Sequence, residues 1–191
     1  MVMKQPEVTA KTRNRLRRAF WMLYERQPIE KITVRQITDL AGYNRATFYM
    51  YYTSVLDLRE HVEDDFITRR ITAIRDAIVD FSDPDSIRIN LAAFLDQSAR
   101  DKPFLKVLLG PHGDPAFVEK MKEAVKPLMM PLVERHISKD ATPLHAEYVR
   151  EFYFSGVLAV VRRWLTDPDP MPTEELLELI VGVFMPDVSV E

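Results

Sequence analysis

The chain has 191 residues, of which 26 are Lys or Arg and 29 are Asp or Glu, so its formal net charge is -3. The length suits one large domain or a small domain followed by a medium one, and an apolar content of 47% suffices for a buried core. The absence of cysteine excludes disulfide scaffolds, thiol nucleophiles and cysteine zinc sites, and the lack of a long apolar run or a leader-like N-terminus predicts a soluble, cytoplasmic protein.

The first predicted helix runs from Thr12 to Arg26. Its apolar residues are three and four positions apart, as on one face of a helix, and Pro28 ends it. This helix belongs to a basic part of the chain. Residues 1–60 hold 11 basic and 6 acidic residues, whereas the remaining chain holds 15 basic and 23 acidic residues. A basic N-terminal third on an acidic body indicates a nucleic-acid-binding module, although chance clustering of charges is an alternative.

Residues 33–52 predict a helix-turn-helix motif. A capping box that begins at Thr33 starts the first helix, and Gly42 ends it. Asn44 can cap a short second helix from Arg45 to Met50. Two short helices joined by a tight glycine turn are typical of this motif.

The second helix of such a motif enters the DNA major groove with its N-terminal residues first. Arg45 can donate two parallel hydrogen bonds to a guanine, and Thr47 can reach a base methyl group or a phosphate. Tyrosine hydroxyls and the positive N-terminus of the preceding helix suit phosphate oxygens. The candidate DNA-binding residues are Thr33, Arg35, Arg45, Ala46, Thr47, Tyr49 and Tyr51.

The remaining sequence also predicts helices. A long helix begins after Ser54 and runs to about Phe81, and Pro127 and Pro131 predict a kink or two helices within 116–138. The other helices are expected at 86–100, 103–109, 143–165 and 173–185. The predicted fold class is therefore all-α, with about nine helices.

The segment ITVRQITDLAGYNRATFYMYYTSVLDL resembles the N-terminal domain of TetR/AcrR-family transcription regulators. The similarity lies in Ala41-Gly42, Asn44-Arg45 and the aromatic run from Thr47 to Tyr52, and it covers about residues 10–62. The stretches LLGPHGDPAFVEKMKE and FSGVLAVVRRWL resemble one C-terminal subgroup of the family. The resemblance implies a DNA-binding domain at 8–62, joined by the long fourth helix to an effector-binding and dimerisation domain at 63–191.

The resemblance also implies a mechanism. Family members are homodimers on near-palindromic, double-stranded DNA operators, and a small effector bound in the C-terminal domain moves the fourth helix. Most members repress transcription and some activate it. Val55 stands where the family often has a lysine that contacts phosphate, so one phosphate contact per half-site is expected to be missing here.

The helix 143–165 is apolar on more than one face, so it needs cover on several sides. In the resembled family the last two helices pair with those of a second subunit, and an intrachain core is the alternative. The candidate interface residues are Phe152, Ser155, Gly156, Ala159, Leu176, Leu179, Ile180 and Val183.

A mostly apolar effector is expected, because the C-terminal part has many large and adaptable side chains. The candidate pocket residues are Phe66, Phe94, Phe104, Phe117, Met121, Met129 and Trp164, each of which could instead be a core residue.

No catalytic residue, metal site or cofactor is predicted. The four histidines form no helical i, i+4 pair, and phosphate-binding loops, HExxH and GxSxG motifs are absent from the sequence. The favoured interpretation is a ligand-responsive regulator of transcription, and in particular a repressor. The alternatives are a transcriptional activator of the same family, an all-α enzyme, and a helical adaptor that binds a partner protein and has lost DNA affinity.

Overall fold

The structure is a computed structural model that describes residues 6–77, 83–110 and 113–184. All nine α-helices in these ranges agree with the all-α prediction, and the described residues contain no β-strand. The chain folds as two units whose boundary lies within helix α4, between Phe66 and Ile67. They are called the N-terminal unit and the C-terminal unit below.

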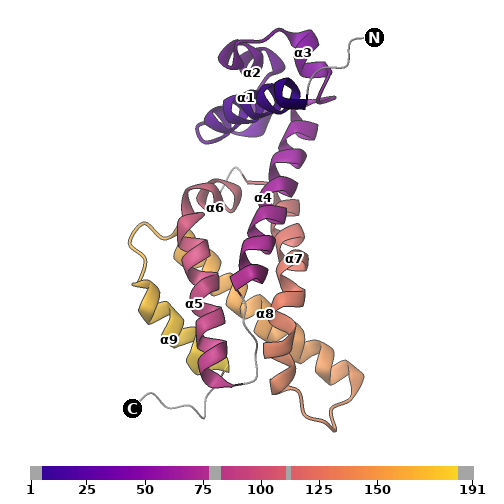
Figure 1. Ribbon diagram of the computed structural model, residues 1–191. Coiled ribbons are helices and arrows are strands. Elements are labelled where there is room, and N and C mark those ends of the chain that lie inside the picture. The colour runs from indigo at the N-terminus through magenta and orange to yellow at the C-terminus, as the bar shows by residue number, and fades with distance from the viewer. Residues whose placement is uncertain (1–5, 78–82, 111–112, 185–191) are drawn as a thin grey trace. The chain divides into compact units, whose positions relative to one another are not determined.

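Helices α1 (Pro6–Tyr24), α2 (Val34–Ala41) and α3 (Arg45–Tyr49) build the N-terminal unit together with the first half of α4 (Val55–Ala77). Helix α1 packs against α2, and α2 packs against α3 (Figure 1). The burial of apolar side chains between these helices provides most of the driving force for folding. The buried core of this unit includes Leu16, Phe20, Tyr24, Ile37, Phe48, Tyr52 and Leu58.

The caps predicted for the two short helices are confirmed. The Thr33 hydroxyl accepts a hydrogen bond from the Gln36 amide at 3.2 Å, and the Gln36 side chain accepts one from the Thr33 amide at 2.8 Å. Gly42 ends α2 in the left-handed region, with φ 72°. The Asn44 side chain accepts a hydrogen bond from the Thr47 amide at 2.8 Å. These local interactions fix the turn that carries α3.

Gly42→Ala is expected to destabilise the N-terminal unit by about 1–2 kcal/mol, because a side chain disfavours the left-handed conformation. A Cβ at Gly42 would meet nothing within 4 Å, so the cost is conformational and not steric. Urea unfolding followed by Trp21 fluorescence, in a Trp164→Phe background, measures the change in this unit. The control is Gly182→Ala, at a helical position with equally open space, which should not lower stability. Equal effects of the two substitutions would contradict the prediction.

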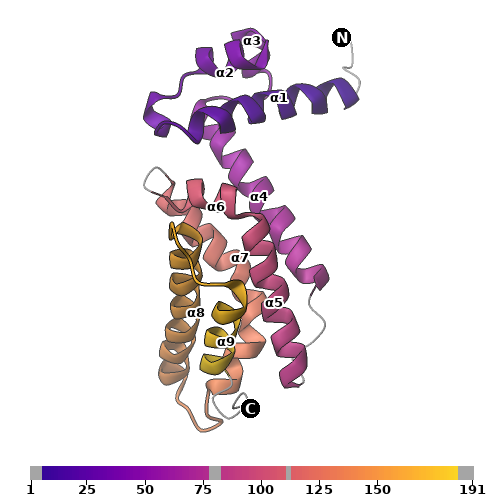
Figure 2. The same ribbon diagram turned by 90° about the vertical axis from the view of Figure 1, so that its left-hand side faces the viewer.

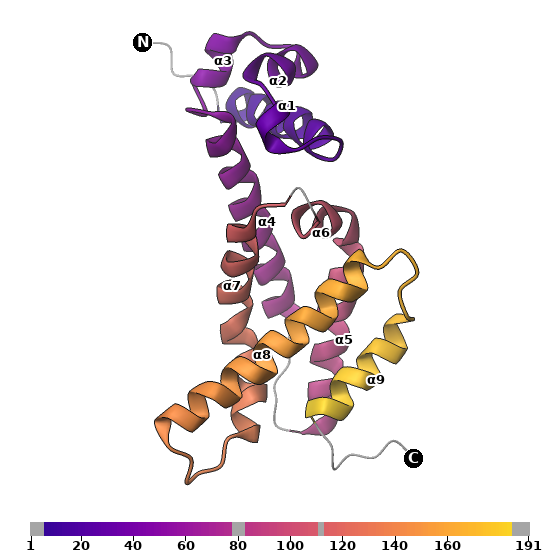
Figure 3. The same ribbon diagram turned by 180° about the vertical axis from the view of Figure 1, so that it is seen from behind.

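The C-terminal unit consists of the rest of α4 and five further helices. These are α5 (Pro84–Arg100), α6 (Lys102–Leu108), α7 (Pro115–Val133), α8 (Pro143–Thr166) and α9 (Thr173–Phe184). Helix α5 packs on α6 and α9, and α8 packs on α6 and α7. Figure 3 shows α8 and α9 together on the near side of this unit, and Figure 2 shows α5 alongside α9. The core includes Leu91, Leu95, Leu108, Phe117, Leu132 and Leu165.

The helices differ most from the predicted ones at two places. Helix α1 begins at Pro6 and not at Thr12, and α7 is one helix that contains both Pro127 and Pro131. The two prolines lie on the exposed side of α7, where water can bind the carbonyl groups that lose their helical partner. The predicted end of the fourth helix, near Phe81, lies outside the described residues. No described helix is both long and apolar enough to span a membrane.

Candidate nucleic-acid interface and ligand pocket

Helix α3 presents most of its side chains to solvent and only Phe48 to the core. Arg45, Ala46 and Tyr49 are exposed, whereas Phe48 is fully buried. The Phe48 ring lies 5.7 Å from that of Tyr52, measured between centroids. This packing fixes the rotation of the short helix about its axis, so that Arg45 at its first position projects from its N-terminal end.

Thr47 and Thr33 already form hydrogen bonds within the motif. The Thr47 hydroxyl donates to the Asn44 side chain at 3.0 Å, so toward DNA it offers its methyl group and its acceptor lone pairs. The Thr33 hydroxyl is part of the capping box of α2. Arg35 is exposed and lies 3.5 Å from the Asp39 carboxylate, a surface pair of small energetic value that leaves Arg35 able to contact a phosphate.

The two candidate tyrosines differ in access. Tyr49 is exposed, but the Tyr51 hydroxyl oxygen is buried. The guanidinium of Arg13 lies 5.7 Å from the centre of the Tyr51 ring, on the face of that ring. The prediction that the Tyr51 hydroxyl reaches a phosphate is therefore wrong for this side-chain position, because protein atoms cover the oxygen.

Basic residues of α1 flank the motif, and the sequence pattern assigns them no role beyond their charge. The pKa of Tyr43, just before α3, is lowered by a hydrogen bond with Thr12 and by the positive charges of Arg15 and Lys11. These two cations and Arg13 therefore add to the positive field beside α3. Because Lys11, Arg13 and Arg15 lie in the helix just before the motif, their position in the sequence could have indicated that they lie near the DNA-binding surface.

Arg17 has a structural role instead. Its Nε donates to the Tyr52 hydroxyl at 3.1 Å, and its guanidinium pairs with Asp65 of α4. Burial raises the pKa of Tyr52, and the positive charge of Arg17 opposes that rise. This side chain thereby ties α1 to α4 within the N-terminal unit.

Val55 opens helix α4, whose N-terminal end is capped by Ser54 and Asp57. The Asp57 amide donates to the Ser54 hydroxyl at 3.0 Å, and the Asp57 carboxylate accepts from the Thr53 amide at 2.6 Å. The hydrogen bond from the Thr53 amide holds the pKa of Asp57 below its ordinary value, which keeps the carboxylate charged. A negative charge there opposes phosphate binding at this helix end, in line with the absence of a lysine at position 55.

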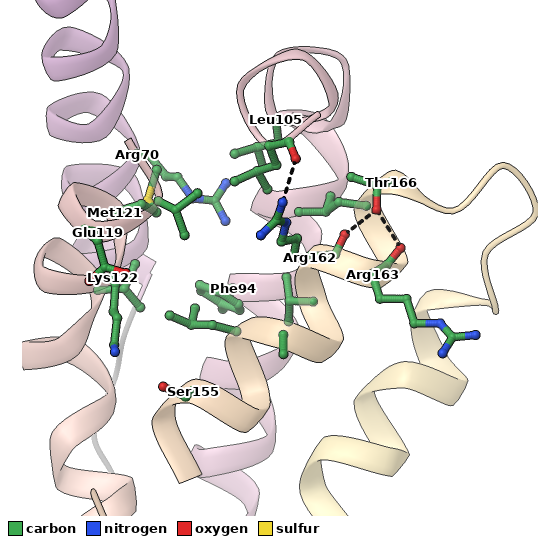
Figure 4. Close-up of a pocket in the computed structure, with 17 residues that line it drawn as sticks. Arg70, Phe94, Leu105, Glu119, Met121, Lys122, Ser155, Arg162, Arg163 and Thr166 are labelled. Carbon is green, nitrogen blue, oxygen red and sulfur yellow. Dashed lines mark hydrogen bonds between the residues drawn. The ribbon is translucent and has the colours of Figure 1, made fainter. Parts of the chain in front are cut away.

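The C-terminal unit contains a pocket of about 500 Å³, within the range of small-molecule sites (Figure 4). Apolar side chains from α5 to α8 form much of its wall, including Phe94, Leu105, Met121 and Leu158. Arg70 reaches in from α4, and Lys122, Arg162 and Arg163 complete the cationic part of the lining.

Of the predicted pocket residues, Phe94 and Met121 line this pocket. The other five do not line it. Phe66, Phe117, Met129 and Trp164 are buried among other core side chains, and the Trp164 indole donates to the Met171 carbonyl at 2.8 Å. Phe104 is exposed at the surface of α6. Helical spacing does not distinguish a core position from a pocket wall, and it gave no reason to choose the arginines.

The outer face of α8 and α9 carries large exposed apolar side chains. Tyr148 and Phe152 are 71% and 75% exposed, one helical turn apart on α8, and Leu179 and Val183 of α9 are half exposed. Phe152, Gly156, Leu179 and Val183 line a shallow apolar groove between the two helices. We name this surface, formed by Tyr148, Phe152, Gly156, Val160, Leu179 and Val183, the α8–α9 face.

Four candidate interface residues are not among those that form the α8–α9 face. Leu176 is 1% exposed and belongs to the core, because its side of α9 faces α5. Ile180 is almost completely buried at the floor of the groove. Ala159 lines the pocket of the C-terminal unit, and Ser155 lines both that pocket and the groove.

Among the described residues, no group of three or more His, Asp or Glu side chains is placed to hold a metal ion.

The family model and the solved structures that this chain resembles both point to TetR regulators. A TetR C-terminal family model, described as "Transcriptional regulator C-terminal region", matches residues 88–185, about half of the chain. A search of curated protein sequences finds no significant match.

Three solved structures have the same fold. A TetR transcriptional regulator from Streptococcus agalactiae 2603V is 24% identical with a TM-score of 0.73, and the alignment covers 92% of this chain and 94% of that one. The dihydroxyacetone kinase operon activator DhaS is 18% identical with a TM-score of 0.60, covering 93% and 96%. A TetR-family repressor, FadR from Thermus thermophilus in complex with lauroyl-CoA, is 19% identical with a TM-score of 0.55, covering 94% and 96%.

Proposed function

The chain belongs to the TetR family of transcriptional regulators, which is not an enzyme family, and on that premise we propose that it is a ligand-responsive repressor that binds a near-palindromic operator as a homodimer in the cytoplasm. The observation that carries the proposal is the exposed N-terminal end of α3. Arg45 projects there from a helix that is capped by Asn44 and anchored in the core by Phe48.

The DNA contacts follow from the chemistry of the motif. Arg45 contacts a guanine edge, Ala46 and the Thr47 methyl group lie against neighbouring bases, and Tyr49 donates to a phosphate. Thr33 and Arg35 contact phosphate at the start of α2. The cations of α1 add long-range attraction, which partly replaces the phosphate contact that Val55 cannot make.

Homodimerisation is supported by the α8–α9 face. Soluble monomers seldom expose a contiguous group of large apolar side chains, and such a patch marks an interface. Two copies related by a twofold axis would bury the same residues on each other. Gly156 lies within the face, and a Cβ added there would meet nothing within 4 Å, so a partner helix could approach closely at this position.

A small effector with an apolar body is proposed to occupy the pocket of the C-terminal unit. The pocket volume and its apolar wall support this, and so does the lauroyl-CoA bound to the structurally similar FadR from Thermus thermophilus. Effector binding and DNA binding are coupled through α4, which contributes residues to both units as one continuous helix.

Selection of random duplex DNA by the purified protein tests the proposal. We expect enrichment of a near-palindrome with two half-sites separated by one helical turn or more. Enrichment of no sequence, with effector candidates absent or present, would favour the adaptor that has lost DNA affinity.

Activation of transcription is a second candidate, because DhaS, of similar fold, is an operon activator. In vitro transcription from a promoter that carries the selected operator separates the two. Repression predicts fewer transcripts when the protein is added, and activation predicts more.

A further inference from the structure

The described residues that line the pocket of the C-terminal unit are unbalanced in charge. Four are cations, Arg70, Lys122, Arg162 and Arg163, and Glu119 is the one acid. Lys122 is neutralised by Glu151 at 2.8 Å, and Arg163 points away from the pocket in Figure 4. Arg70 and Arg162 remain as the cations that face the cavity from different helices.

Arg162 lacks a charged partner within the described part of the chain. Its guanidinium donates to the neutral carbonyl of Leu109 at 3.2 Å. It therefore contributes an uncompensated positive charge to the pocket, next to apolar wall residues such as Leu105 and Leu158.

Arg70 is the most buried of the four cations, with 4% of its side chain exposed. It donates to the Asp101 carboxylate at 2.9 Å and to the Ser98 hydroxyl, and it lies over the Phe94 ring at 5.5 Å. Burial lowers the pKa of Arg70, and the neighbouring Asp101 opposes that effect. Asp101 itself does not line the pocket. Arg70 therefore contacts both the Asp101 carboxylate outside the pocket and the pocket itself.

We propose that the pocket binds amphipathic carboxylic acids, whose carboxylate pairs with Arg70 in competition with Asp101 and whose apolar body lies against Phe94, Leu105 and Met121. The role of this acid as the effector rests on the proposed function. The positive charge of Arg162 strengthens the attraction for the acid and does not distinguish it from other anions. Selectivity comes from the guanidinium of Arg70, which matches the planar geometry of a carboxylate.

The competition also provides a route from the pocket to α4. Arg70 lies on α4, and Asp101 lies where α5 ends and α6 begins. In the unliganded protein their ion pair ties α4 to that junction. A ligand carboxylate that takes over Arg70 would release this tie, and α4 could then shift.

Isothermal titration calorimetry with decanoate, with decan-1-ol as the uncharged analogue of equal chain length, tests the proposal on the full chain without DNA. We expect the wild-type protein to bind decanoate about tenfold or more tightly than decan-1-ol, as a charge-assisted pair in a buried site provides. Arg70→Gln is expected to remove most of that difference, because only the weaker attraction of Arg162 for the acid remains. Equal affinities for acid and alcohol, or binding of neither, would overturn the proposal.

Asp101→Asn distinguishes competition from a purely structural ion pair and does not depend on the folding of the Arg70 variant. Because it removes the internal rival, it should tighten decanoate binding by roughly tenfold. Asp96→Asn is the matched control, since it removes an exposed acid of α5 outside the pocket with the same change in net charge. Unchanged or weaker decanoate binding by the Asp101 variant, relative to this control, would overturn the proposal. Selection of operator DNA is independent of these titrations, so failure of one leaves the other interpretable.

Discussion

Arg45→Ala is expected to weaken operator binding by about 1–3 kcal/mol per half-site and to relax base preference at one position of each half-site. A dimer carries the substitution twice, so the total loss is about 2–6 kcal/mol, or roughly 30-fold to more than 10⁴-fold in Kd. The effect is large because the guanidinium makes two hydrogen bonds whose loss leaves a guanine edge unpaired. Competition titrations with operators mutated at each position measure both the affinity and the preference.

Two further variants separate base recognition from simple charge. Arg45→Lys keeps the positive charge but loses the planar pair of donors, so it should lose base preference while it retains much of the nonspecific affinity. Arg100→Ala removes an exposed cation of α5 and should leave the preference intact. If Arg45→Ala binds the operator with unchanged preference and affinity, α3 is not the recognition helix.

Phe152→Glu is expected to convert the dimer into a monomer. The side chain is 75% exposed in the single chain and belongs to the α8–α9 face, so the substitution costs little in the monomer. In a twofold dimer it places two unpaired carboxylates in an apolar contact, which costs several kcal/mol. Light scattering should then give a mass close to the chain mass of 22.3 kDa in place of twice that value.

Loss of the dimer should also weaken operator binding by about 10²–10⁴-fold, because two linked recognition helices gain from effective concentration. The control is Ile89→Glu, which adds the same charge at an exposed apolar position of α5 outside the groove and should leave the dimer intact. An unchanged dimer mass for Phe152→Glu would show that the subunits meet elsewhere.

The sequence predicted the helices well where local chemistry defines their ends. Thr33, Gly42 and Asn44 each act through hydrogen bonds or backbone conformation within four residues. The helix ends that they define can therefore be predicted without knowledge of the tertiary structure. The two prolines of α7 were harder, because their effect depends on which side of the helix faces solvent. That side is set by the packing of α7 on α8.

Side-chain roles in the C-terminal unit were predicted less well, for the same physical reason. Phe94 and Phe117 have the same character in the sequence, yet one lines the pocket and the other is sealed in the core. Arg70 was not predicted, since a lone arginine in a long helix is usually solvated. The role of Arg70 can be inferred only from the folded chain, in which Ser98 and Asp101, about 30 positions away, lie within hydrogen-bonding distance.

Fluorescence anisotropy of the selected operator, titrated with the full chain at several salt concentrations, tests the central claim most directly. The predicted result is two chains bound per palindrome, with log Kd rising linearly as log salt concentration rises, at a slope of about 0.9 for each phosphate contacted. Binding that saturates at two chains and weakens steeply with salt would match a dimer whose recognition helices lie in the major groove. Absence of binding, or binding that salt and operator symmetry leave unchanged, would contradict it.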